Sequence, residues 1–169
     1  MLKKIALVLM FVLPVGAFAQ TLKFAHVRSS EIIQAMPEYA KAQKDMEALQ
    51  KKYADEIQKA QQELQKKYTE LMQQQDSLPQ NILERRQKEI QDLAQRGEEF
   101  QQEVQQILNK AQNDMTAPIF KKLQDAINTV GSEGGYIYVF DLDRAGIPYV
   151  NETQSTNINA TVKTKLGIK

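Results

Sequence analysis

The most regular feature of the chain is a stripe of apolar or small residues within the polar stretch 38–77. Successive stripe positions lie three, four, four, three, four, four and three residues apart. Eleven residues over three turns correspond to about 3.67 residues per turn, so the stripe follows one face of a nearly straight helix. The stripe comprises Met46, Leu49, Tyr53, Ile57, Ala60, Leu64, Tyr68 and Leu71.

A second helix is predicted after a short break at residues 77–81, where Pro79 is incompatible with a helix interior. Its apolar stripe is similar in length, and the connection is short, so the two helices should pair antiparallel. Forty residues at 1.5 Å each give an arm of roughly 60 Å. We assign the following residues to the seam between the two helices: Met46, Leu49, Tyr53, Ile57, Leu64, Leu71, Ile90, Leu93, Phe100 and Val104.

The two ends of the chain contain short segments with strand composition. Residues 22–27 form one predicted strand, and residues 136–142 form the strongest, because they are β-branched or aromatic and apolar on both faces. A further strand is predicted at 147–150, at a sheet edge because Pro148 cannot donate a hydrogen bond.

Short helices accompany these strands. Ser29 or Ser30 can cap a helix that begins near Glu31, and Pro37 then introduces a bend before the arm. Asn157 or Asn159 can cap a last helix near the end of the chain.

The predicted fold class is therefore α+β, predominantly α, with a long helical hairpin on a small β body. The arm spans 38–117, and the body is built from 20–37 and 118–169. The core of so small a body would be only marginally stable by itself, and it must also anchor the long arm. The sequence therefore predicts that several copies assemble through shared strands. The residues predicted to form the oligomeric body are Phe24, Val27, Tyr136, Ile137, Tyr138, Val139, Phe140, Ile147 and Val150.

The composition and charge of the chain exclude several classes of function. The formal net charge is +1 and the chain has no cysteine, which excludes disulfides and thiolate chemistry and gives no basic patch for nucleic acid. The chain begins with Lys3 and Lys4, an apolar run at 5–15 and an A-x-A site at 17–19, which predicts a signal peptide at 1–19. The apolar run is too short to cross a bilayer, which takes about 20 residues. The protein is therefore expected to be exported.

No constellation of catalytic, cofactor-binding or metal-binding residues is found, and we expect no enzyme. His26 is the single histidine, without a neighbouring ligand or acid, and is interpreted as structural. The adjacent pairs Asp55-Glu56 and Glu98-Glu99 point about 100° apart on a helix and do not converge.

Several ordered motifs together resemble the Skp/OmpH family: the strand F-A-H-V, the segment E-I-I-Q-A-M-P-E-Y, the Gln-rich hairpin, the segment G-G-Y-I-Y-V-F-D and the closing N-I-N. The resemblance covers essentially the whole chain after the signal peptide. It implies a trimer with a β-barrel body and three helical tentacles around a cavity. It also implies a periplasmic protein that binds unfolded outer-membrane proteins without ATP. This chain departs from the strongly basic family pattern, with 14 Lys and Arg against 16 Asp and Glu between residues 38 and 130.

Two arm residues are candidates for contact with such partners. Met72 lies beside the stripe and Tyr68 on it, and Met suits varied apolar partners because it is flexible and polarizable. A different function, an envelope scaffold that docks one fixed protein, would need a specific tip or a continuous apolar outer stripe. The Gln-rich outer surface favours the chaperone. A membrane surface is not indicated as a partner.

Overall fold

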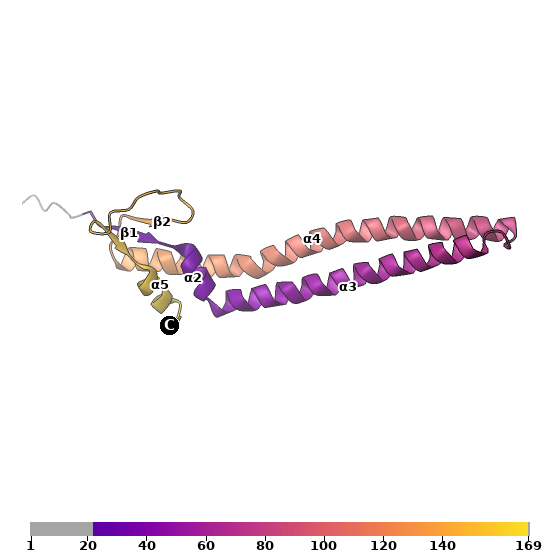
Figure 1. Cartoon of the computed structure of the whole chain (residues 1–169). Helices are drawn as coiled ribbons and strands as arrows, with labels where there is room; N and C mark the ends of the chain where they lie inside the picture. The colour runs from indigo at the N-terminus through magenta and orange to yellow at the C-terminus, as the bar shows by residue number, and fades with distance from the viewer. Residues whose placement is uncertain (1–21, 169) are drawn as a thin grey trace, which may run out of the picture.

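The computed structural model describes residues 22–168 and shows a small body from which a long two-helix arm extends (Figure 1). The predicted signal peptide lies outside the described residues. The elements in chain order are β1 (Phe24–Val27), α2 (Ser29–Ala35), α3 (Pro37–Gln74), α4 (Gln80–Glu133), β2 (Tyr138–Asp141), β3 (Ser155–Asn157) and α5 (Asn159–Lys165).

The arm follows the sequence pattern closely. Pro37 begins α3, where its missing N–H costs nothing, and α3 runs 38 residues to Gln74. The tip extends over 75–79, and α4 then returns for 54 residues. The helix α4 continues through Pro118, so a single helix belongs to both the arm and the body (Figure 1). The antiparallel hairpin is confirmed.

The helix α4 ends at two glycines. A Cβ atom on Gly134 would collide with the ring of Tyr136, which folds back over this position. Gly135 has φ of 64°, in the left-handed region that glycine adopts without strain. The chain therefore turns sharply and enters the sheet.

The sheet has three parallel strands in the order β2-β1-β3. The central strand is β1, and β2 and β3 are the two edges. Parallel neighbours need a long crossover connection, and between β1 and β2 the whole arm provides it. The hairpin is thus a greatly extended crossover.

Two features of the predicted sheet are wrong. Residues 147–150 form no strand, because they lie in the loop after β2, and the third strand is Ser155–Asn157 instead. The segment S-T-N lacks strand composition, and it is recruited because β1 has a free edge, where Ile158 donates to the carbonyl of His26. The strand β2 is also shorter than predicted, and within the single chain only one of its faces is covered.

The cap of α2 also differs from the prediction. The helix begins at Ser29, and Arg28 is its N-cap residue without a side-chain bond. Two carboxylates cap the helix instead: Asp141 at the end of β2 accepts from the N–H of Ser29, and Asp143 in the turn after β2 accepts from the N–H of Ser30. A contact between distant segments has replaced a local cap.

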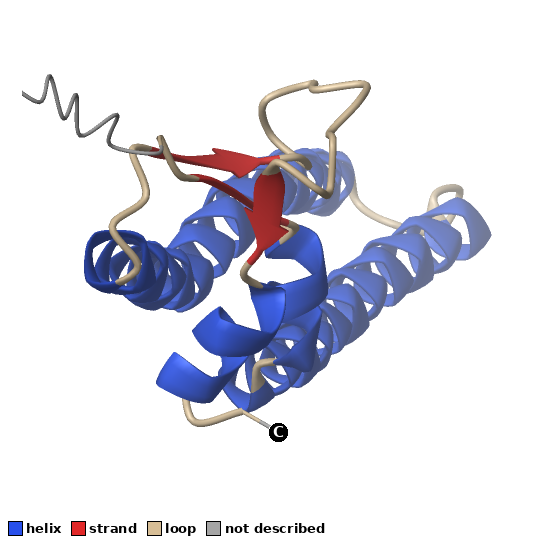
Figure 2. Ribbon diagram, turned by 90° about the vertical axis from the view of Figure 1, so that its left-hand side faces the viewer, coloured by secondary structure: helices blue, strands red, loops and turns tan. Residues whose placement is uncertain are grey.

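The core lies in the body, on the side of the sheet that faces the helices (Figure 2). It joins side chains from both ends of the chain and from the end of α4. Its buried members are Ala25, Val27, Ile32, Ile33, Met36, Ile119, Leu123, Ala126, Ile127, Val130, Ile158 and Val162.

Candidate functional site

All ten residues assigned to the arm seam are buried or half-buried. Leu71 and Val104 are the most enclosed, with 4% and 2% of their surface exposed. Midway along the arm the rings of Tyr53 and Phe100 meet with their centroids 6.3 Å apart. The other eight seam residues, these two rings included, are half-buried. Between the root and the tip of the arm, the two helices therefore contact each other through a narrow apolar strip.

Tyr68 and Met72, the candidate contact residues, lie one turn apart on α3 near the tip. Their exposed fractions are 49% and 43%, whereas Leu71 between them is buried. The sequence pattern placed Tyr68 in the seam stripe, but its ring lies largely outside it. Two large apolar side chains thus face outward on the same side of the helix.

The nine residues predicted for the oligomeric body divide into groups. Val27, Tyr136 and Val139 pack on the core of their own chain. Phe24 of β1 and Tyr138 and Phe140 of β2 occupy the strand positions that alternate with Val27 and Val139. They therefore lie on the opposite sheet face, where the rings of Phe24 and Tyr138 stack 6.5 Å apart. We call these three residues the aromatic face.

The aromatic face is open to solvent in the single chain. Tyr138 is 60% exposed and Phe140 37%, and Ile137 just before the strand is 48% exposed. Ile147 and Val150 do not join this face through strand pairing, because they lie in the loop that follows β2. Parallel sheets are normally covered on both sides, so this arrangement is unusual for an isolated chain.

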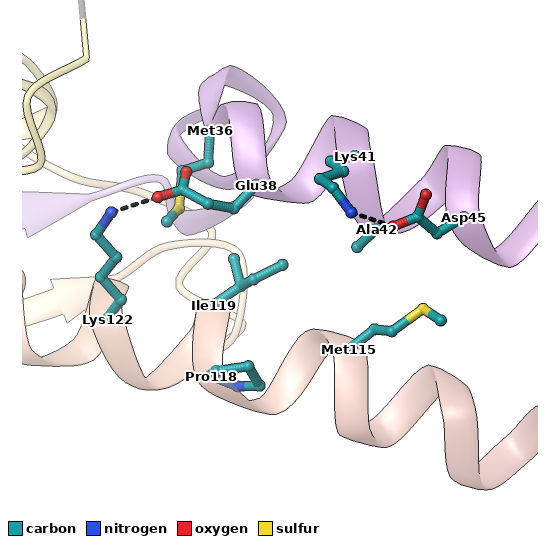
Figure 3. Close-up of a pocket in the computed structure, with 9 residues that line it drawn as sticks. All are labelled: Met36, Glu38, Lys41, Ala42, Asp45, Met115, Pro118, Ile119 and Lys122. Atoms are coloured by element: carbon teal, nitrogen blue, oxygen red, sulfur yellow. Dashed lines mark hydrogen bonds and ion pairs between the residues drawn. The ribbon is translucent and has the colours of Figure 1, made fainter.

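A cavity of about 320 Å³ lies at the root of the arm, where α3 and α4 diverge. Figure 3 shows Ile119 on α4 pointing toward α3 across this space. Met36, Ala42 and Met115 add further apolar surface, and Pro118 also lines the cavity. The side chains at the root leave space between the helices rather than closing the seam there.

Ion pairs join the two helices at both ends of the arm. At the root, Lys122 donates to Glu38 and holds the pKa of that carboxyl below its ordinary value (Figure 3). Near the tip, Lys67 and Glu89 pair at 2.5 Å. This bond lowers the pKa of Glu89 and raises the pKa of Lys67. Both pairs are accessible to solvent, so they contribute more to the alignment of the helices than to stability.

Side chains that could bind a metal do not gather in the part of the chain that the structure describes. Between residues 22 and 168 no group of three or more His, Cys, Asp or Glu side chains could hold a metal ion. His26 is buried, with Nδ1 at 2.9 Å from the hydroxyl of Ser155, which ties β1 to β3. None of the helices in this range combines the length and apolar character of a membrane span.

The main surface feature that sequence reasoning missed is a pattern of glutamines. The arm carries many Gln residues, but their arrangement on the two helices becomes meaningful only once the helices are paired. A helical periodicity count taken separately for polar residues would have found the row on each helix, but not that the two rows lie on one side of the arm.

Comparisons with known proteins agree with this architecture. The sequence profile of the family described as outer membrane protein (OmpH-like) matches residues 23–166. A crystal structure of a protein from Caulobacter crescentus CB15, described as an OmpH-like outer membrane chaperone, superimposes with a TM-score of 0.75. The match covers 86% of this chain and 83% of that one at 13% sequence identity, so it concerns the fold alone. A search among curated protein sequences found no match.

Proposed function

This chain belongs to the OmpH-like family of outer membrane proteins, and from that premise we propose that it is a holdase chaperone. Its clients are unfolded outer-membrane proteins in the periplasm, and binding requires no ATP. A holdase keeps exposed apolar segments from meeting one another before they fold.

The observation that carries this proposal is the shape of the arm together with its exposed apolar side chains. The helix α3 is 38 residues long, about 57 Å at 1.5 Å per residue, and it is held in a body at one end only. Tyr68 and Met72 stand exposed on this lever, far from the body. A long polar surface with scattered apolar contacts suits a partner that is extended and variable in sequence.

Assembly is the second part of the proposal. The aromatic face of one copy would be covered by neighbouring copies, so that three bodies form one shared barrel and three arms surround a cavity. The exposure of Tyr138 and Phe140 on a parallel sheet supports this arrangement. Export through the signal peptide at 1–19 would deliver the chain to the compartment of its clients.

An aggregation assay tests the chaperone activity. A urea-unfolded outer-membrane protein is diluted with and without this chain, and light scattering is followed over time. Suppression at about one trimer per client supports the proposal. No effect on several such clients, or suppression that requires ATP, contradicts it. Retention of a single fixed protein and of no unfolded client would favour the scaffold instead.

A matched pair of variants tests the assembly. Tyr138→Asp places a charge on the aromatic face, so it should convert the trimer into folded monomers in sedimentation velocity. Tyr149→Asp makes the same change at a loop tyrosine that is 76% exposed, and the trimer should persist. Wild-type protein that sediments as a stable monomer at micromolar concentration would contradict the shared body.

A further inference from the structure

The two broad faces of the arm differ in chemistry. On α3, a row of glutamines runs beside the seam at helical spacing and continues into Tyr68 and Met72. Between Gln43 and Met72 this row contains no Lys or Arg and a single acid, Glu47. The amides of the row are Gln43, Gln50, Gln58, Gln61 and Gln65.

The returning helix α4 repeats the pattern. Its row of amides also lies beside the seam, with one acid, Glu98, and no basic residue. The amides of this row are Gln87, Gln91, Gln101, Gln105 and Gln112. On the other flank of each helix nearly every position is charged, as in Lys52, Glu56, Lys59 and Glu63 of α3.

Two cavities between the helices are each lined by amides of both rows, which places the rows on the same side of the hairpin. Near the root, a cavity of about 430 Å³ is lined by Gln43 and Gln50 from α3 and by Gln112 from α4. Midway, a cavity of about 230 Å³ is lined by Gln61 from α3 and Gln101 from α4. We call this side the amide face.

The charged flanks meet on the opposite side. Lys67 of α3 and Glu89 of α4 form the ion pair that crosses the seam, and Glu70 and Arg85 line the same cavity beside them. We call this side the charged face. Many of its side chains are already paired along their own helix, as in Lys41–Asp45 and Lys110–Asp114.

On the amide face, by contrast, glutamine side chains without hydrogen-bond partners in the described structure lie beside apolar seam residues, which form the floor of the cavities. Among the described residues no hydrogen bond engages the side chains of Gln43, Gln50, Gln58, Gln61 or any amide of the α4 row. The floor of the midway cavity consists of seam residues, including Ile57, Leu64, Leu93 and Phe100.

From this arrangement we propose that the amide face holds the client, as an extended polypeptide segment, through hydrogen bonds to its main chain. The inference rests on the proposed function and names the surface and the chemistry that would perform it. A glutamine amide offers both donors and an acceptor, as the client backbone does. Every sequence has the same backbone, so such bonds tolerate different clients. Apolar client side chains then contact the seam floor, Tyr68 and Met72.

Charge argues against other occupants of this face. Nucleic acid or an anionic membrane would require Lys or Arg to neutralise phosphates, and the amide rows contain neither. A second arm packed along this face would require a continuous apolar stripe, whereas here glutamines rim the floor. An uncharged, unpaired polypeptide backbone is the complementary partner.

Site-directed photo-crosslinking tests the assignment of the face. A benzophenone amino acid replaces Gln61 or Gln105 on the amide face, or Lys59 or Glu103 at matched depth on the charged face. The full chain without residues 1–19 is mixed with a urea-unfolded outer-membrane β-barrel protein. Crosslinks to that protein from the two amide-face positions alone support the proposal. Equal or stronger crosslinking from the charged face overturns it, as do amide-face crosslinks only between copies of this chain.

Affinity measurements test the chemistry. The triple variant Gln58→Ala, Gln61→Ala, Gln105→Ala should raise the Kd for the unfolded protein about tenfold, because three hydrogen-bonding side chains are lost. The control Lys59→Ala, Glu63→Ala, Glu103→Ala should remain within about twofold of wild type, since surface charges contribute little. Circular dichroism confirms that both variants keep wild-type helicity.

A modified peptide separates main-chain from side-chain recognition. A peptide copied from one barrel strand is compared with the same peptide carrying N-methyl groups at alternate amides. Methylation should weaken binding to wild type and change little for the Gln triple variant. Two results would refute this inference alone. One is a methylated peptide that loses the same affinity for wild type and for the triple variant; the other is a triple variant that binds clients as tightly as wild type does. Failure of wild type to bind any unfolded client refutes the proposed function itself.

Discussion

The body and the arm bury their apolar side chains to very different degrees. In the body, Ala25, Ile32 and Val162 are 0% exposed, and the core receives side chains from all of its helices and from β1. In the arm only Leu71 and Val104 reach comparable burial, and the rest of the seam is half-exposed.

This difference has a geometric cause. A pair of helices can shield only the narrow strip along which they touch, whereas a sheet covered by three helices encloses residues on several sides. Stability should therefore be concentrated in the body, and the arm should depend on it. The arm retains apolar side chains at its surface, which a chaperone needs and a compact domain would bury.

The largest effect is expected for a truncation in the body core. Ile32→Ala removes atoms from a site that is fully enclosed, so the free energy of unfolding should fall by about 3 kcal/mol. Urea denaturation followed by near-ultraviolet circular dichroism of the tyrosines measures it. A loss below about 1 kcal/mol would contradict the claim that the body carries the stability.

A similar truncation in the arm should cost less. Leu64→Ala acts at a half-buried seam position beside the midway cavity, so we expect a loss of about 1–2 kcal/mol. Hydrogen exchange should show faster opening of 57–71 and 90–104, with unchanged protection of β1 and α5. Uniform loss of protection across the chain would show that the arm and the body unfold as one unit.

The smallest effect is expected at the junction between α2 and β2, and it depends on pH. The hydroxyl and N–H of Ser30 donate to Asp143 at 2.6 and 2.8 Å and hold the pKa of its carboxyl below the ordinary value of 3.8. Because this pKa is lowered in the folded state, the contribution of Asp143 to the free energy of unfolding is fully present above pH 3.8. It is lost as the pH falls through the folded pKa.

The variant Asp143→Asn removes this titration. Its Tm should be slightly below that of wild type at pH 7, because the neutral amide is a weaker acceptor for the N-terminus of α2. The difference in Tm between variant and wild type should disappear at a pH well below 3.8, where the wild-type carboxyl is also neutral. A gap that is independent of pH would assign the effect to side-chain shape instead of charge.

Most of the arm could be predicted because its determinants are local. The stripe from Met46 to Leu71, Pro37 at the first turn and Pro79 at the tip each act within a few residues, and the structure places the helices accordingly. Among the predicted sheet elements, the strands at 22–27 and 136–142 were found in shortened form because their composition is distinctive.

The remainder depended on contacts between distant residues. The segment Ser155–Asn157 has no strand signal of its own, and it becomes β3 only because the edge of β1 lies free beside it. The cap of α2 comes from Asp141 and Asp143, more than a hundred residues away in the chain. No local pattern encodes such partners.

By itself, the sequence determined that this protein has a long antiparallel helical arm and a small body with strands, because helix periodicity and proline positions are properties of neighbouring residues. Only the tertiary structure decided that the strands are parallel, that β1 is central and that the glutamines of α3 and α4 lie on one side of the arm. The physical reason is that each of these features is a relation between segments. It exists only after the chain has folded and brought them together.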